Sequence, residues 1–362
     1  MHRLEIIRRT IATLGPGAAV CSPHHRGISH SALAEFMDCM AYVAFPECGS
    51  LPTKVVPDHM RHLDGSTVLQ RVLTHMADLI LSQVCSAFLL QGHAKSCGNE
   101  AEVVKSLKDG QESEQQGCVL FNDTQAGGTA DSLYREAKQT AAEIAEAFLT
   151  QELRLVRWLL RTDAEAILEH DVASTSLSEV ALCYPGIRCM LHQRTAHALH
   201  KLGAPNNLTR LLTEMGHSAT GIDIHPAASI GHHFFIDHGT GTVIGSTSIV
   251  GNHVTMYHGV TLGVASFPVD RKTGKKIRNL PRHPIVEDRV VLYANATVLG
   301  RITIGEGSVI GANCRVVESL PPSSVVTRPR KRKPPAAGTA WQGGEWGVWQ
   351  RHTHRGRESE KK

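Results

Sequence analysis

The chain has few aromatic residues and no regular pattern of cysteines. Only 5% of its 362 residues are aromatic, and its nine cysteines are odd in number and contain no C-x-x-C pair. Scattered cysteines of this kind argue against both a disulfide framework and a zinc ribbon. We therefore predict a reducing compartment and a cytoplasmic location.

Long apolar runs and a large excess of charge are missing as well. No stretch of the sequence approaches the roughly 20 apolar residues that a membrane span needs, and Gly15-Pro16-Gly17 interrupts the apolar run near the start. We therefore expect residues 1–30 to be a flexible extension rather than a targeting segment. The net charge of +4 is too small to indicate a nucleic-acid partner, and the basic run 328–333 is interpreted as solvated. Neither a membrane nor a nucleic acid is expected as a partner.

The most informative pattern present is a repeat of six residues between Ile224 and Val316. A helix face repeats near 3.6 residues and a half-buried strand at two, so neither explains it. A period of six predicts a parallel β-helix, with a Gly/Val-rich antiparallel sandwich as the alternative. Three series carry the repeat: Ile224, Ile230, Ile236 and Thr242; Ile244, Val250, Met256 and Leu262; and Val286, Leu292, Val298, Ile304, Ile310 and Val316.

Three hexads would form the three sides of one coil of a triangular prism. Each repeat residue would point inward, where one buried Ile or Val contributes roughly 1.5–3 kcal/mol. Glycines that follow repeat positions suit corners, which need a positive φ or a close backbone approach. They are Gly231, Gly245, Gly251, Gly263, Gly305 and Gly311.

Upstream of the repeat the pattern is helical. Apolar residues at helix spacing predict helices over 31–45, 68–90, 131–161, 185–202 and 207–215, the last ended by Gly216. The predicted class is α+β: an α-helical domain at 31–216 with a mobile insertion near 95–129, then a left-handed parallel β-helix of hexapeptide repeats at 217–327. A loop extruded at 264–283 and a basic, disordered C-terminal tail at 328–362 complete the expected organisation.

A helical domain ahead of a hexad β-helix resembles serine O-acetyltransferase, a branch of the hexapeptide-repeat acyltransferases. Four motifs make the resemblance specific: GIDIHPAA from Gly221, FIDHGTG from Phe235, GVTLG from Gly259 and PRHP from Pro281. It covers roughly residues 30–327 and is strongest from Tyr184 to Pro322. The resemblance implies transfer of acetyl from acetyl-CoA to L-serine. We expect direct attack in a ternary complex without an acyl-enzyme, because no cysteine or serine stands in a recognisable nucleophile motif.

His238 is the candidate general base. Removal of a hydroxyl proton suits histidine, whose ordinary pKa of about 6.5 lies near working pH. Asp223 lies fifteen residues earlier, close to one coil, so we expect it on the same wall of the prism, about 4.8 Å away by strand spacing. By resemblance the two form the catalytic dyad, whereas a plain corner histidine is the alternative.

The candidate substrate ligands are Asp237, Asp171, Arg282 and His283. By resemblance Asp237 and Asp171 face the substrate amine, although Asp171 also suits a capping role. Arg282 has paired donors that fit a carboxylate. His283 follows it and by resemblance helps to bind serine, the alternative being two basic loop residues.

Acetyl-CoA is the expected co-substrate, and no metal is expected. Gly263, Ala294 and Ala312 occupy positions at which the family lets the cofactor's thin chain approach the coils, although corner geometry also explains them. Cations of the extruded loop either meet the CoA phosphates or are solvated. They are Arg271, Lys272, Lys275, Lys276 and Arg278.

Two departures from the family limit the resemblance. Ser246 stands where the family usually has glutamate, and the chain ends in Lys362 rather than the isoleucine that enters cysteine synthase. A complex with cysteine synthase is therefore doubtful. A homotrimer or a dimer of trimers is expected, because the flat faces of short coils pack together.

Two other functions remain open. A zinc carbonic anhydrase shares the prism, and His253 and His258 form an H-x4-H pair that suits a metal between subunits. A non-catalytic regulatory or scaffolding paralogue would also keep the prism.

Overall fold

The computed structural model describes residues 27–48, 52, 54–56, 64–96, 127–277, 280–328 and 348–350. The chain forms two compact units, one containing residues 1–156 and 198–211 and the other residues 157–197 and 212–362. The change from helix to strand falls between Thr220 and Asp223, a few residues after the predicted boundary at 216/217. The division between the compact units instead falls within three helices. Most of the insertion predicted near 95–129 and most of the predicted tail lie outside the described residues.

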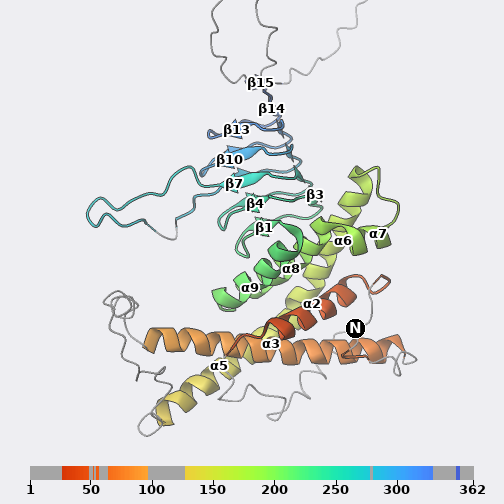
Figure 1. Ribbon diagram of the computed structural model, residues 1–362, viewed down its shortest axis with the longest axis vertical. Coiled ribbons are helices and arrows are strands. Elements are labelled where there is room, and N and C mark those ends of the chain that lie inside the picture. The colour runs from red at the N-terminus through yellow and green to blue at the C-terminus, as the bar shows by residue number, and fades with distance from the viewer. Residues whose placement is uncertain are drawn as a thin grey trace, which may run out of the picture. The chain divides into compact units, whose positions relative to one another are not determined.

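Helices occupy the described chain as far as Thr220 (Figure 1). They are α2 (His30–Ala44), α3 (Gly65–Ser96), α5 (Gly127–Ala147), the π-helical segment η2 (Phe148–Glu152), α6 (Leu153–His170), α7 (Leu177–Cys183), α8 (Pro185–Lys201) and α9 (Asn206–Thr220). In the first unit, α2 packs against η2 through the rings of Phe36 and Phe148, whose centroids lie 6.0 Å apart.

All five predicted helices are confirmed, with two differences. The helix expected over 131–161 is continuous but includes the π-helical segment η2 and extends to His170. The end predicted at Gly216 is wrong, because α9 continues to Thr220. Gly216 serves a different purpose: a Cβ there would lie 2.9 Å from Cβ of His192, so glycine permits a close approach.

Helix α3 corrects one expectation about apolar runs. Its segment Gly65–Gln91 is long and apolar enough to cross a membrane by length and composition alone. Of the window that meets this criterion, 61% is buried inside the structure, as is typical of the core helix of a soluble protein.

The hexad region forms the predicted parallel β-helix, whose strands have two or three residues each (Figure 1). Wall A contains β1 (Asp223–Ile224), β4 (Val243–Ile244), β7 (Thr261–Gly263), β10 (Thr297–Leu299) and β13 (Arg315–Val316). Wall B contains β2 (Ser229–Ile230), β5 (Ile249–Val250), β8 (Ile285–Val286) and β11 (Thr303–Ile304). Wall C contains β3 (Phe235–Asp237), β6 (Thr255–Tyr257), β9 (Val291–Leu292), β12 (Val309–Ile310), β14 (Ser324–Val326) and the antiparallel β15 (Val348–Gln350).

The strand register confirms the hexad repeat and its interruptions. Asp223 pairs with Val243, 20 residues on, because two residues are inserted after the first coil. The next step on wall A has 18 residues, and the one after it has 36 because a loop leaves the prism. The inward residues stack in buried columns, one of which is Ile224, Ile244, Leu262, Val298 and Val316.

Positive φ and close backbone approach, the two reasons for which glycine was expected at the corners, are met by different residues. The glycines that follow repeat positions have ordinary φ and allow close approach. At Gly245, for example, a Cβ would collide with Cδ2 of His283. Several left-handed corners are instead occupied by non-glycine residues, including His233, His238 and His253, with φ of 58°, 54° and 56°.

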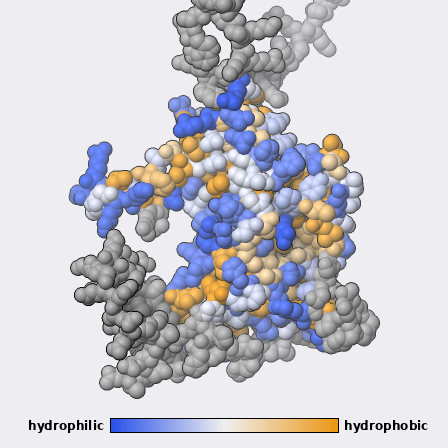
Figure 2. All heavy atoms as spheres, viewed as in Figure 1, coloured by the Kyte–Doolittle hydropathy of each residue, from blue (hydrophilic) through white to orange (hydrophobic). Residues whose placement is uncertain are grey.

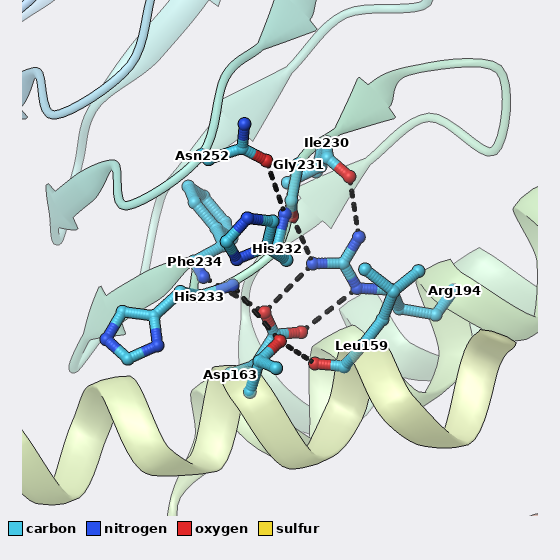
Figure 3. A network of polar contacts seen from close by, with 10 residues as sticks. Leu159, Asp163, Arg194, Ile230, Gly231, His232, His233, Phe234 and Asn252 are labelled. Carbon is cyan, nitrogen blue, oxygen red and sulfur yellow. Dashed lines mark hydrogen bonds and ion pairs between the residues drawn. The ribbon is translucent and has the colours of Figure 1, made fainter.

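A buried ion pair joins helices α6 and α8 to the first coil (Figure 3). Arg194 donates from Nε and Nη2 to the two carboxylate oxygens of Asp163, at 3.0 and 2.9 Å. The same guanidinium donates to the carbonyls of Ile230 and Gly231, at 2.6 and 2.7 Å, and Asp163 accepts the Phe234 amide at 3.0 Å. Complete burial raises the pKa of Asp163, while Arg194 and the Phe234 amide oppose that rise.

The buried pair leads to a prediction about stability. Replacing Arg194 by Met leaves the Asp163 carboxylate buried without its cation, so we expect the free energy of unfolding to fall by about 3–5 kcal/mol. Urea unfolding at pH 7 measures the change. Lys201→Met is the control, because Lys201 meets Glu152 at 3.2 Å but is 48% exposed, and this pair should contribute less than about 1 kcal/mol. Equal losses for the two variants would contradict the prediction.

Candidate active site

The candidate site lies at the corner where wall C ends and wall A begins. His238 directly follows β3 at this corner, has a φ of 54°, and its side chain is 77% exposed. Its Nε2 lies 3.7 Å from Oδ1 of Asp237. Wall C pairs Asp237 with Tyr257, so His238 and His258 occupy the same position in consecutive coils, and their rings meet edge-on with centroids 6.1 Å apart. The predicted stacking of these two histidines is confirmed.

Asp223 lies near this corner, although not on the wall that its spacing suggested. It begins β1 on wall A, whereas His238 follows wall C, so the expectation of one shared wall is wrong. The Asp223 amide donates to the Thr242 carbonyl at 2.9 Å, and Thr242 closes the turn that starts at His238. The shared corner is compatible with the dyad, which remains a prediction.

Asp171 approaches this corner from the segment that follows α6. Its Oδ1 accepts the Ala173 amide at 2.9 Å, as in a turn, and its Oδ2 accepts the Tyr184 hydroxyl at 2.7 Å. These two hydrogen bonds, with a contribution from His238, lower the pKa of Asp171. Asp171 therefore combines the turn role that the sequence left open with a position near His238.

Tyr184 and Tyr257 were not recognised from the sequence as site residues. The hydrogen bond to Asp171 raises the pKa of Tyr184 to about 12, and Asp237 contributes to the rise. Burial raises the pKa of Tyr257, with further contributions from Tyr293, Asp237 and Asp171. Both carboxylates thus act on both phenols, so Asp171 and Asp237 lie near the same two tyrosines. Only the spatial arrangement reveals this, because neither tyrosine stands in a charged motif.

His283 is buried and held by Thr247. The Thr247 amide donates to Nδ1 of His283 at 3.1 Å, so Nδ1 is the acceptor and Nε2 carries the proton of the neutral ring. Burial, together with Arg282 and Arg301, lowers the pKa of His283 to about 4. The Arg282 amide donates to Oγ1 of the same threonine at 2.9 Å. Their binding of substrate stays a prediction.

Two of the three predicted cofactor residues continue the column of His238. Wall C register places Ala294 on His258 and Ala312 on Ala294. The side chains of this column are therefore small in the coils beyond the two imidazoles. Gly263 is not in this column: it is the last residue of β7 on wall A, from which the loop leaves the prism. The structure therefore brings together Ala294 and Ala312 but not Gly263.

The loop between β7 and β8 projects from the prism as predicted, and its residues 278 and 279, including Arg278, lie outside the described residues. Figure 2 shows it hydrophilic at the tip and more hydrophobic nearer the coils. Phe267, Val269 and Ile277 are between 41% and 52% exposed. Lys276 lies over the Phe267 ring, 4.6 Å from its centroid.

The H-x4-H pair that suggested a carbonic anhydrase does not converge. His253 packs beside His233, with ring centroids 4.5 Å apart, whereas His258 belongs to the column of His238. The two histidines therefore lie on different corners, which are separated by β6. This arrangement does not favour the predicted metal site of that pair.

The hexad region is similar to a known protein family. A family model described as bacterial transferase hexapeptide (six repeats) matches residues 283–317. The serine acetyltransferase of Mycobacterium tuberculosis is 48% identical over 167 residues, which are 46% of this chain and 68% of that protein. The serine acetyltransferase of Helicobacter pylori strain 26695 is 46% identical over 160 residues, which are 44% of this chain and 87% of that protein.

Two further relatives extend the comparison. A Synechococcus elongatus protein named "Serine acetyltransferase, plasmid" is 47% identical over 205 residues, which are 57% of this chain and 63% of that protein, less than two thirds of its length. A crystal structure of serine acetyltransferase isoform 3 from Entamoeba histolytica, in complex with cysteine, has a TM-score of 0.58 and 27% identity. The match covers 91% of this chain and 95% of that one.

The lowered pKa of His283 predicts a pH-dependent stability. The folded ring binds its proton only near pH 4, whereas the unfolded ring does so near its ordinary pKa of about 6.5. The neutral ring therefore stabilises the fold fully above about pH 6.5, and this contribution falls as the pH drops toward 4, by at most roughly 3 kcal/mol. Urea unfolding of the wild type and His283→Gln between pH 7.5 and 4.5 should show a difference in stability that narrows toward low pH. A difference that widens would contradict it.

Proposed function

The chain belongs to the serine acetyltransferase family, and from this membership we propose that it transfers the acetyl group of acetyl-CoA to the hydroxyl of L-serine. The products would be O-acetyl-L-serine and CoA, which makes the chain an acyltransferase of cysteine biosynthesis. One observation supports this most directly: an exposed imidazole, His238, lies beside two carboxylates that act on the same pair of phenols.

The acidic side of the site suits the ammonium group of an amino acid. Asp171 and Asp237 supply negative charge, and Tyr184 holds one oxygen of Asp171 in place. Arg282 would bind the substrate carboxylate with its paired donors. An amino acid gripped at both charged ends would present its side-chain hydroxyl to His238, which fits serine by size and by chemistry.

The proposed reaction is a direct attack. His238 takes the hydroxyl proton while the serine oxygen adds to the thioester carbonyl. The tetrahedral adduct then collapses as the carbon–sulfur bond breaks, and the imidazolium returns its proton to the leaving thiolate. Asp223 would stabilise the imidazolium from the start of wall A, as an orienting carboxylate does in hydrolase triads. No step needs a covalent acyl-enzyme.

Acetyl-CoA would lie along the column of His238. The small side chains of Ala294 and Ala312 continue that column, so a thin acyl-bearing chain can approach His238 without steric conflict. The exposed apolar residues of the loop between β7 and β8 would cover it, and the cations at the loop tip would meet its phosphates.

We also propose that the protein is a homo-oligomer in the cytoplasm. Val243, Ile249 and Tyr293 project from the prism walls and are 38–42% exposed, which suits a further packing surface. The six cysteines in the described part of the chain form no disulfide bond with one another, as a reducing compartment favours: Cys39, Cys48, Cys85, Cys183, Cys189 and Cys314.

The direct test is release of CoA thiol from acetyl-CoA by the pure protein with L-serine. We expect turnover with serine and a loss of about 10²–10⁴-fold in kcat for His238→Ala, because proton transfer contributes on this scale. Circular dichroism should show an unchanged fold. Wild-type kcat in the variant would refute the role of His238. Absent wild-type turnover with intact binding of acetyl-CoA would favour the scaffolding paralogue.

Tyr184→Phe tests the acidic side of the site. Without its hydroxyl the Oδ2 atom of Asp171 loses its hydrogen bond, so the carboxylate is less well placed for the ammonium group. We expect KM for serine to rise by about 3–10-fold with kcat nearly unchanged, since the lost hydrogen bond positions Asp171 without touching substrate and a typical hydrogen bond contributes about 0.5–1.5 kcal/mol. Initial-rate kinetics at saturating acetyl-CoA measure it. An equal fall in kcat would place Tyr184 in the chemical step instead.

A further inference from the structure

Three potential metal ligands meet where the end of α6 approaches the first coil. Glu169 and His170 are the last two residues of α6, and His233 lies in the turn between β2 and β3. One ligand atom from each of the three lies within 4.8 Å of the other two. None of these residues belongs to the candidate active site, and no metal is expected from the sequence.

The three side chains differ in exposure in a way that suits metal binding. His233 is 11% exposed and Glu169 is 62% exposed, with its Oε2 3.0 Å from Nε2 of His233. His233 thus provides a fixed point, because its amide also donates to Oγ1 of Thr162 at 3.1 Å. Glu169, being exposed, can adjust its side chain around this point.

His170 is prepared as a ligand by its own helix. The Ala166 carbonyl lies 2.8 Å from Nδ1 of His170, and a carbonyl can only accept, so Nδ1 carries the proton. The unprotonated lone pair is then on Nε2. A metal-bound histidine almost always donates its other N–H to a carbonyl or carboxylate, which fixes the ring's tautomer and orientation. The Phe235 ring, stacked on His170 with centroids 5.8 Å apart, supports that orientation.

Two more imidazoles surround the group. The His253 ring lies 4.5 Å from the His233 ring and 4.9 Å from the His232 ring, centroid to centroid. Register explains the pairing, since wall C places His233 and His253 at the same corner of consecutive coils. Figure 3 shows His232 and His233 beside Asp163, on the turn that Arg194 and Asp163 hold.

We propose that Glu169, His170 and His233 bind one divalent transition-metal ion, with zinc as the best match. Two imidazole nitrogens and one carboxylate oxygen are ligands that zinc accepts, whereas magnesium and calcium prefer oxygen alone. Ligand atoms around tetrahedral zinc lie about 3.4 Å apart, given bonds of about 2.0–2.1 Å. Oε2 of Glu169 and Nε2 of His233, 3.0 Å apart, lie close to this spacing, and a small shift of the end of α6 would bring the third ligand atom, now within 4.8 Å, into reach. The ion would join α6 to the first coil.

The test is zinc binding by the full chain after removal of metals with EDTA. Titration against a chromogenic chelator should reveal a zinc equivalent whose affinity falls at least about tenfold in each ligand variant, since loss of even a supporting residue costs about 10–100-fold. The variants are Glu169→Gln, His170→Phe, which keeps the stacking on Phe235, and His233→Asn, which tolerates the positive φ. Cobalt in place of zinc should give visible absorption bands that disappear with the same substitutions.

His217→Ala is the matched control. His217 meets Glu214 at 3.3 Å on the surface of α9, a pair that offers two ligand atoms where the proposed site offers three. Its zinc binding should equal that of the wild type. The proposal is overturned if the wild type holds no more zinc than the ligand variants, or if magnesium displaces zinc at equal concentration. Because binding is measured without substrate, the result stands independently of acetyl transfer.

Discussion

The buried pair of Asp163 and Arg194 is the constraint on which the second compact unit depends. A parallel β-helix leaves the backbone groups of its first coil without a neighbouring coil, and buried groups of this kind need partners. Arg194 binds the Ile230 and Gly231 carbonyls, and Asp163 accepts the Phe234 amide. Helices α6 and α8 thereby close the open end of the prism, as a capping element does in other solenoids.

This closure also determines where chemistry can occur. Because Asp163 fixes α6 on the first coil, the end of that helix must pass close to the corner that follows β3. Asp171 therefore reaches the neighbourhood of His238, and the Glu169–His170 pair reaches His233, within three consecutive residues. One ion pair thus places both the acidic side of the candidate active site and the proposed metal ligands, although the two sites have different chemistry.

The sequence predicted the part of the structure that repeats. The hexad series predicted the strands, the inward columns, the two-residue shift after Thr242 and the loop beyond Gly263. It could do so because each buried repeat residue is apolar or β-branched and recurs at a fixed spacing. It did not predict the partners that meet only in space. Tyr184 stands in no charged motif. Asp223 lies on wall A, whereas His238 follows wall C, because the first coil has 20 residues and a separation of fifteen falls short of a full coil. Gly216 was misread for a related reason: a glycine near the end of a helical pattern predicts a helix stop, whereas here it allows close approach to His192 inside the helix.

The left-handed corners connect backbone geometry with function. A non-glycine residue with positive φ carries a conformational cost of order 1 kcal/mol, which glycine avoids and asparagine reduces. Asn295 and Asn313 occupy such corners in the later coils, as this cost favours. His233, His238 and His253 occupy them in the first two coils, and Arg289 and Ser323 occupy two more in the later coils; histidine, like asparagine, is enriched at positive φ. Each of these corners holds its imidazole at a fixed place on the prism, and the two proposals use two of them: proton transfer by His238 and metal binding by His233.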